Sequence, residues 1–175
     1  GNTSSMYAKA YFETLNFDSI TINPYMGKDS VEPFLEYQNK HTIILALTSN
    51  VGAFDFQTKN IADNSKKLYE EVIRTSTSWK NSNQLMYVVG ATKASYLKEI
   101  RNIVPNNFLL IPGVGAQGGD LKEVCDNGLN NEVGLLINSS RSIIYASNDT
   151  NFDIYAAKNA QEIQSQMEDI LSSIN

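Results

Sequence analysis

The amino-acid sequence predicts an α/β fold in one domain, built on a parallel sheet. Two observations lead to this prediction. Five short runs of apolar and β-branched residues are nearly continuous in hydrophobicity, which is typical of parallel strands that are covered on both faces. Segments with helical spacing separate these runs along the chain of 175 residues. The alternation of the two patterns indicates a series of β/α units.

The five apolar runs share an aliphatic, β-branched composition and end at turn-forming or polar residues. They predict strands at Phe17–Asn23, Thr42–Thr48, Leu85–Gly90, Phe108–Pro112 and Glu132–Asn138.

Two helices are predicted in the first part of the chain from their spacing and from candidate caps. Apolar residues recur every four positions from Tyr7 to Leu15, behind the candidate N-caps Ser4 and Ser5. The segment Asp29–Glu32 resembles a capping box and opens the next predicted helix.

The later helices are predicted mainly from apolar residues three or four positions apart. These stripes are Leu68, Val72, Ile73, Ser76 and Trp79; then Leu97, Ile100 and Ile103; and finally Ile163, Met167, Ile170 and Ile174. A short helix is also expected over Asp120–Asn127, and Gly128 behind it suits a left-handed C-terminal cap.

The number of strands leaves two α/β folds open. A (β/α)₈ barrel usually needs about 250 residues and eight strands. Three further β/α units of roughly 30 residues each would bring this chain near that size. An open doubly wound sheet needs only five or six strands. The choice between them therefore depends on the motifs.

Composition excludes several classes of protein. A net charge of −5 and a pI near 4.9 argue against broad nucleic-acid binding. No apolar run approaches the roughly 20 residues of a membrane helix. The single cysteine, Cys125, rules out an internal disulfide and indicates a reducing, cytoplasmic setting. With one histidine, His41, there is no His/Cys cluster for a metal, so neither metal nor cofactor is expected.

The glycine-rich stretch within Phe108–Asp120 is the most informative motif. A predicted strand runs into four glycines and then a helix start, an arrangement that suits anion binding by backbone N–H groups. The glycines from Gly113 to Gly118 also satisfy G-x-G-x-x-G, the fingerprint of dinucleotide sites. However, Pro112 precedes the first glycine, and no acid closes the strand Leu135–Asn138 to hold a ribose. A phosphate cradle is therefore favoured.

Arg141 follows the last predicted strand and is the second candidate for binding a phosphate. In (β/α)₈ barrels a recurrent phosphate site lies in the loops after strands seven and eight. If the visible strands are the fourth to the eighth, the glycine-rich stretch and Arg141 occupy those two loops. An arginine supplies planar donors that match a phosphate.

Four segments, in this order, resemble the orotidine 5′-phosphate decarboxylase family, its longer bacterial branch in particular. They are Asn23-Pro-Tyr-Met-Gly-Lys-Asp-Ser30, Leu47-Thr-Ser-Asn50, Pro112-Gly-Val-Gly-Ala-Gln-Gly-Gly-Asp120 and Arg141-Ser-Ile143. The resemblance implies a (β/α)₈ TIM barrel, of which this chain supplies the last five units. It also implies cofactor-free decarboxylation of orotidine 5′-monophosphate to uridine 5′-monophosphate (UMP) in de novo pyrimidine synthesis.

The resemblance assigns phosphate-binding roles to five positions. Gln117 is similar to the family's lid glutamine, which bridges the phosphate and the pyrimidine. Arg141 is similar to the arginine that clamps the phosphate, with Ser140 beside it where many members have glycine. The backbone N–H groups of Gly118 and Gly119 are expected near the phosphate.

Two further positions and one absence follow from the same resemblance. Ser49 is similar to the serine that recognises the pyrimidine edge, and Thr3 to the threonine that reaches the ribose of a neighbouring subunit. The family's catalytic Asp-x-Lys-x-x-Asp motif is absent, since Lys9, Lys28 and Lys93 lack the flanking acids. Catalytic residues are therefore expected upstream of Gly1.

The whole chain, residues 1–175, is thus expected to be the C-terminal part of a single barrel domain that lacks its first three β/α units. Its expected partners are the N-terminal segment of the same enzyme, a second copy in a homodimer, and the nucleotide. Alone, it is expected to be inactive and poorly soluble, because barrel edge strands would be unpaired. Another phosphate-binding barrel lyase or epimerase, a dinucleotide-binding module and a non-catalytic remnant remain as alternatives.

Overall fold

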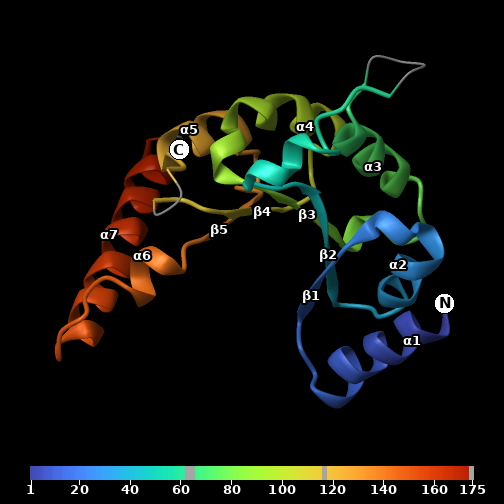
Figure 1. Ribbon diagram of the computed structural model, residues 1–175, viewed down its shortest axis with the longest axis horizontal. Coiled ribbons are helices and arrows are strands. Elements are labelled where there is room, and N and C mark those ends of the chain that lie inside the picture. The colour runs from blue at the N-terminus through green and yellow to red at the C-terminus, as the bar shows by residue number, and fades with distance from the viewer. Residues whose placement is uncertain (62–65, 116–117, 174–175) are drawn as a thin grey trace.

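The computed structural model describes residues 1–61, 66–115 and 118–173. Five parallel strands form one sheet in the order β1-β2-β3-β4-β5 (Figure 1). The strands are β1 (Ser19–Ile22), β2 (His41–Leu47), β3 (Leu85–Val89), β4 (Leu109–Pro112) and β5 (Leu135–Asn138). All five predicted strands and their parallel direction are confirmed.

The strand order decides between the two folds that the sequence left open. Each described strand pairs with the strand before it along the chain, so the order never reverses. A doubly wound sheet requires such a reversal, and this alternative is therefore wrong for the described strands. One irregularity interrupts the regular register: Leu45 pairs with Val88 and Leu47 with Val89, which leaves Ala46 as an extra residue in β2.

The helices follow the outer side of the curved sheet from one end of the molecule to the other (Figure 1). They are α1 (Asn2–Lys9), α2 (Lys28–Leu35), α3 (Leu68–Thr77), α4 (Leu97–Ile103), α5 (Leu121–Gly128), α6 (Arg141–Ile144) and α7 (Phe152–Ser172). A π-helical stretch, η1 (Ala10–Thr14), extends α1, and the 3₁₀ segments are η2 (Pro24–Met26), η3 (Val51–Phe54), η4 (Ser82–Gln84) and η5 (Ala91–Tyr96). No helix in these described parts is long and apolar enough to cross a membrane.

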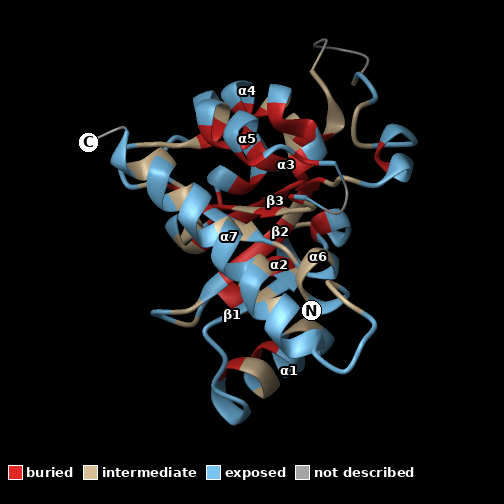
Figure 2. Ribbon diagram, turned by 90° about the vertical axis from the view of Figure 1, so that its left-hand side faces the viewer, coloured by how far each residue is buried: buried red, intermediate tan, exposed pale blue. Residues whose placement is uncertain are grey.

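Both faces of the sheet are apolar, which explains the continuous hydrophobicity of the strands. On the helix side, Ile44, Tyr87 and Leu109 are fully buried in the main core. Figure 2 shows buried residues along β2 and β3. On the opposite side, Ile43 and Met86 pair across β2 and β3 and belong to a second, smaller cluster. The helices cover one face of the sheet, and strand residues alone form the small cluster on the other.

The first helix buries a different face from the one predicted. Tyr7 and Leu15 are more than half exposed, while Ala8 and Phe12 are buried. Phe12 packs edge-on against Phe34 of α2, with ring centres 6.3 Å apart. The predicted stripe and the buried stripe have the same four-residue spacing, so spacing alone could not set the orientation of the helix.

The predicted caps of the first two helices are wrong. The helix α1 already begins at Asn2, so Ser4 and Ser5 lie inside it. The residue before α2 is Gly27, which makes no side-chain cap, and Asp29–Glu32 is therefore not a capping box. Gly27 has a φ of +90°, a conformation that glycine adopts easily, and this turn starts the helix one residue before Asp29.

The short helix α5 has the predicted start but a different reason for its final glycine. Asp120 caps it, since its Oδ1 accepts a hydrogen bond of 2.8 Å from the Glu123 N–H. Gly128 lies inside the helix and has no positive φ. A methyl group there would lie 3.1 Å from Leu135 Cδ2 and 3.2 Å from Leu97 Cδ1. Close packing, not a left-handed cap, requires glycine.

The closing helix α7 packs as predicted. Ile163, Met167 and Ile170 lie against the main core, and Ile174 falls outside the described residues. The helix α6 was not predicted.

The guanidinium of Arg101 binds four backbone carbonyls in the two connections that lead to the amino ends of β4 and β5. Nε donates to the Gly128 carbonyl over 2.6 Å, and Nη2 to the Gly134 carbonyl over 2.7 Å. Nη1 donates to the carbonyls of Val104 and Asn107, over 3.2 and 2.6 Å. Burial lowers the pKa of Arg101 to about 10, which still leaves it charged at neutral pH. One side chain thus fixes the turns that lead into two strands.

Replacing Arg101 by methionine should lower the free energy of unfolding by about 3 kcal/mol, because several carbonyls lose a charged donor. Urea unfolding measures the change. The matched control is Lys98→Met, an exposed lysine of the same helix, which should change stability by less than about 0.5 kcal/mol. Equal losses in the two variants would contradict the role given to Arg101.

Candidate functional site

The turns that follow β2, β3, β4 and β5 contact one another in that order. Parallel strands place their carboxyl ends at the same edge of a sheet, and ligand sites of α/β proteins lie at that edge. Four of the five turns therefore form one row of backbone. The predicted site residues Ser49, Gly118, Gly119, Ser140 and Arg141 all belong to this row.

The turn after β2 rests on the turn after β3 through a glycine. A methyl group at Gly90 would lie 2.5 Å from the Ser49 nitrogen and 2.6 Å from its Cα. Thr92 Oγ1 also donates to the Ser49 carbonyl over 3.4 Å. Only glycine permits this approach, and it fixes the backbone of Ser49 from one side.

A side chain that sequence reasoning missed holds the same turn from the other side. Gln57 Oε1 accepts from the Thr48 N–H over 2.7 Å, and Gln57 Nε2 donates to Thr48 Oγ1 over 2.9 Å. Thr48 Oγ1 also donates to Asn50 Oδ1 over 2.5 Å. Gln57 forms no local pattern with Thr48, so no signal in the sequence could have identified it.

The glycine-rich turn after β4 is closed by its own hydrogen bonds. The N–H groups of Gly115, Gly118 and Gly119 donate to the carbonyls of Gly119, Gly115 and Gly113, over 3.0, 2.8 and 3.3 Å. Gly113, Gly115 and Gly118 have φ of +95°, +77° and +81°. The glycines therefore serve the backbone conformation. The N–H groups of Gly118 and Gly119, predicted to face a phosphate, here donate within the turn.

A second glycine joins this turn to the turn after β3. Gly119 is buried, and a methyl group there would overlap Cβ of Ala91 and lie 2.8 Å from the Gly113 carbonyl oxygen. The turn after β3 is thus in contact with Ser49 on one side and with the glycine-rich turn on the other.

The glycine-rich turn also contacts the turn after β5 and helix α6. Ser139 Oγ lies 3.4 Å from the Val114 carbonyl, to which it donates, and 2.5 Å from Ser142 Oγ. A methyl group at Gly115 would lie 3.8 Å from Ser142 Oγ. Asn159 of α7 donates to the Ser142 carbonyl over 2.7 Å. The helix that begins with Arg141 is therefore held from two sides.

Arg141 is exposed at the start of α6. Within residues 1–61, 66–115 and 118–173, its guanidinium forms no ion pair. Ser140 precedes it as the N-cap residue of α6 and donates from Oγ to Asn138 Oδ1 over 3.2 Å. The row of turns thus ends in a cation that is available to an anionic ligand.

The two remaining predicted residues differ from those of the row. Gln117 lies outside the described residues. Thr3 is exposed in the first turn of α1, and α1 and α6 lie on opposite sides of the molecule (Figure 1).

Two hollows lie along the carboxyl edge of the sheet. One, of about 470 Å³, lies between the ends of β1 and β2 and helix α3. The other, of about 320 Å³, lies between the glycine-rich turn, α6 and α7. The linings of the two hollows include Gln57 and Gly119 respectively, so each borders the row of turns.

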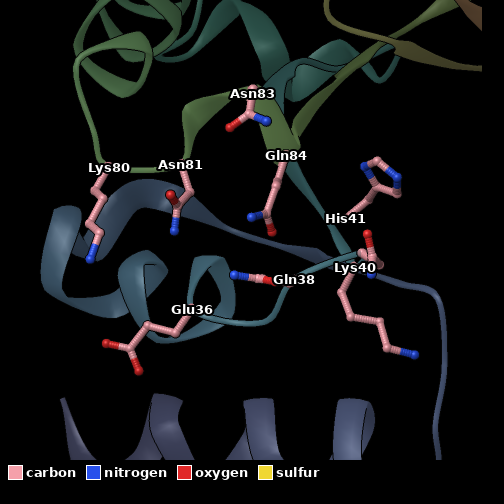
Figure 3. Close-up of a pocket in the computed structure, with 9 residues that line it drawn as sticks. Glu36, Gln38, Lys40, His41, Lys80, Asn81, Asn83 and Gln84 are labelled. Atoms are coloured by element: carbon pink, nitrogen blue, oxygen red, sulfur yellow. The ribbon is translucent and has the colours of Figure 1, made fainter.

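A larger, polar pocket of about 710 Å³ lies at the opposite edge (Figure 3). It is lined by residues before β2 and β3 and by the first residue of β2: Glu36, Gln38, Asn39, Lys40, His41, Lys80, Asn81, Asn83 and Gln84. Its side chains point in different directions and do not converge on one point (Figure 3). In parallel barrels the amino edge serves stability, whereas active sites lie at the carboxyl edge. This pocket is therefore not the candidate site, although it is larger.

Comparisons with known proteins relate the chain to one family. Residues 1–151 match the sequence model of the orotidine 5′-phosphate decarboxylase / HUMPS family. The chain is 64% identical over 173 residues to an orotidine 5′-phosphate decarboxylase of Flavobacterium johnsoniae, and 68% identical over 167 residues to one of Christiangramia forsetii. These matches cover 99% and 95% of this chain but only 63% and 61% of the two relatives.

Solved structures give the same result for the fold. The chain is similar to the Leishmania donovani UMP synthase, with a TM-score of 0.79 and 37% identity over 94% of this chain and 36% of that protein. It is also similar to the Leishmania donovani OMP decarboxylase, with a TM-score of 0.78 and 34% identity over 94% of this chain and 63% of that protein.

Replacing Gly90 by alanine should lower the free energy of unfolding by about 2–3 kcal/mol, because the methyl group must displace the Ser49 backbone. Urea unfolding measures the loss. The comparison variant is Gly118→Ala, where nothing lies within 4 Å of the new methyl group and only the positive φ opposes it. This variant should lower the free energy of unfolding by about 1 kcal/mol. A larger loss at Gly118 would contradict the close approach at Gly90.

Proposed function

The chain belongs to the orotidine 5′-phosphate decarboxylase / HUMPS family, and on this premise we propose that it is the nucleotide-binding part of an enzyme that converts orotidine 5′-monophosphate to UMP. In that reaction the bond between ring carbon six and the carboxyl carbon breaks, and carbon dioxide leaves. The electron pair stays on carbon six, where a proton then binds. The balance needs no oxidant or reductant, in agreement with the expectation that no cofactor takes part.

The observation that carries the proposal is the continuous row of turns at the carboxyl edge. Ser49 lies at one end of the row, Arg141 at the other, and the glycine-rich turn lies between them. A pyrimidine nucleotide has its groups in a matching order, with the pyrimidine at one end and the phosphate at the other. The row therefore supports a nucleotide as the ligand, with its base toward Ser49.

At the phosphate end, Arg141 supplies a charged, planar donor, and Ser140 lies next to it in the same turn. We assign to Gln117 a neutral bridge between the phosphate and the pyrimidine. Gly118 and Gly119 would contribute N–H donors if these shifted from the turn to the ligand. The phosphate is remote from carbon six, so its binding energy can serve to hold the reacting ring in place.

At the pyrimidine end, the role of Ser49 depends on a fixed backbone. Gly90 and Thr92 contact it on one side, and Gln57 holds the preceding residue on the other. A hydroxyl that is already oriented loses less free energy when it binds a base edge.

We place the catalytic Asp-x-Lys-x-x-Asp array and three further β/α units in a preceding segment, so that residues 1–175 are the last five units of a (β/α)₈ barrel in one domain. The coverage of only 63% and 61% of two relatives supports this proposal. So do the outer edges of β1 and β5, which pair with no other described strand. A barrel would pair both edges and cover the inner face. The chain alone would then lack activity.

A homodimer in the cytoplasm completes the proposal. Thr3 is remote from the row of turns within one chain, which supports a role at the ribose of a second subunit. Tyr25 and Met26, after β1, are 87% and 77% exposed, as expected for residues that a partner covers. The one cysteine, Cys125, is buried and unpaired, which is compatible with a reducing compartment.

The proposal is tested by producing the chain together with an N-terminal segment that carries the Asp-x-Lys-x-x-Asp motif. The assembled protein should decarboxylate orotidine 5′-monophosphate, followed by absorbance, and should bind UMP and not NAD. The chain alone should show no turnover. Absence of both turnover and UMP binding in the assembled protein would refute the proposal, and NAD binding would favour a dinucleotide module.

Arg141→Ala should raise KM for the nucleotide about 10- to 100-fold and Gln117→Ala about fivefold, because hydrogen bonds to charged groups contribute more than neutral ones. Both losses should nearly vanish with orotidine, which has no phosphate. Steady-state kinetics on the two substrates provides the measurement. Equal losses on both would mean that these residues support only the fold.

A further inference from the structure

A buried lysine beside the row of turns has no part in the function proposed above. Lys93 of η5 is only 8% exposed, and its Nζ lies 3.9 Å from the centre of the Phe54 ring in η3. We propose that Lys93 is a positioning residue: by holding Phe54 it fixes η3 and keeps Ser49 oriented toward the pyrimidine. This inference rests on the proposed function, because it assigns a base-binding role to Ser49.

The burial of Lys93 requires a compensating contact. Removing an ammonium group from water costs several kcal/mol unless another group replaces the lost hydration. In the described part of the chain, Lys93 takes part in no ion pair. The face of the Phe54 ring, with its negative quadrupole, is the contact that the structure provides. We infer that this contact restrains the Phe54 ring, which is otherwise 52% exposed.

Lys93 belongs to the same turn that supports Ser49. Its N–H donates to the Gly90 carbonyl over 2.9 Å, and the helical geometry of η5 is interrupted at Lys93 itself (φ −115°, ψ 26°). Gly90 and Thr92, the other members of this turn, contact the Ser49 backbone directly. The lysine thus adds a third contact between the turns after β3 and β2.

The restraint on Phe54 reaches Ser49 through a short path. The Ala53 N–H donates to the Asn50 carbonyl over 3.1 Å, which closes the turn of η3. Asn50 directly follows Ser49 and also accepts from Thr48 Oγ1. Because each step is a covalent bond or a hydrogen bond, fixing Phe54 limits the backbone of Ser49.

A second cation–ring contact indicates that η5 is an anchor for the whole connection from β2 to α3. Lys67, directly before α3, places its Nζ 4.4 Å from the centre of the Tyr96 ring at the end of η5. Tyr96 in turn packs edge-on against Tyr69, at 5.9 Å. The connection is therefore held by η5 where it leaves the sheet and where it enters α3.

Direct contact of Lys93 with an anionic group of the substrate is the main alternative. The two roles differ in what they require of Phe54. A lysine that touches the substrate can act without the ring, whereas a positioning lysine acts only through it. The effect of removing the ring therefore separates them.

The experiment uses the assembled enzyme with Lys93→Met, Phe54→Leu, the double variant and Lys93→Arg. We expect Lys93→Met and Phe54→Leu each to weaken UMP binding about fivefold. KM should rise by the same factor, while kcat stays within about twofold of the wild-type value. The double variant should be no weaker than the single ones, and Lys93→Arg should retain wild-type affinity. Lys98→Met, an exposed lysine of α4, is the matched control.

Two further measurements distinguish positioning from general destabilisation. Ribose 5-phosphate carries the phosphate without the pyrimidine, so its affinity should not change in any of the variants. Hydrogen exchange at the Ala53 amide should be faster in Lys93→Met and Phe54→Leu, because the turn of η3 is no longer restrained. The exchange measurement does not depend on catalysis.

Each contrary result overturns a stated part of the inference. Weaker binding of UMP in Lys93→Met but not in Phe54→Leu would show direct substrate contact. Equal loss of ribose 5-phosphate affinity would show a purely structural role. Unchanged variants in an enzyme that binds UMP would refute the inference alone, whereas a wild-type enzyme that binds no UMP would refute the proposed function and this inference with it.

Discussion

The candidate site depends on the uninterrupted parallel pairing of β1 to β5. Parallel strands in sequential order place every carboxyl end at one edge, so residues as far apart in sequence as Ser49 and Arg141 come to share one row of turns. Pairing also sets the spacing along that row, because neighbouring strands lie about 4.8 Å apart. A loss of pairing between any two of the last four strands would separate the two ends of the row, even with every site residue in place.

Glycine residues allow the turns after neighbouring strands to contact one another directly. Gly90 and Gly119 permit approaches to Ser49 and Ala91 that any side chain would prevent. The row is therefore made of backbone, and the functional side chains are attached to it at few points. Such a construction keeps binding groups at fixed distances, while it leaves the chemistry to side chains elsewhere in the barrel that we propose.

Much of the fold could be predicted, since strands that are buried on both faces carry an unambiguous continuous pattern. The orientation of α1 could not, because Tyr7 and Phe12 fit equally spaced stripes and only the position of Phe34 decides between them. Ser49 was predicted as a site residue through the family's motifs, and Arg141 both through those motifs and from its place after the last strand. Gln57 and Lys93 were not, because their roles arise from contacts that have no local signature.

The extra residue in β2 has a consequence for the direction of side chains at the site. Up to Leu45, odd-numbered residues such as Ile43 face the inner cluster, yet Leu47 lies in the main core beside Ala46. The alternation of side chains between the two faces of the sheet is thus inverted two residues before Ser49. Adding or removing a single residue in this buried strand would therefore re-aim the turn that carries Ser49, without altering Ser49 itself.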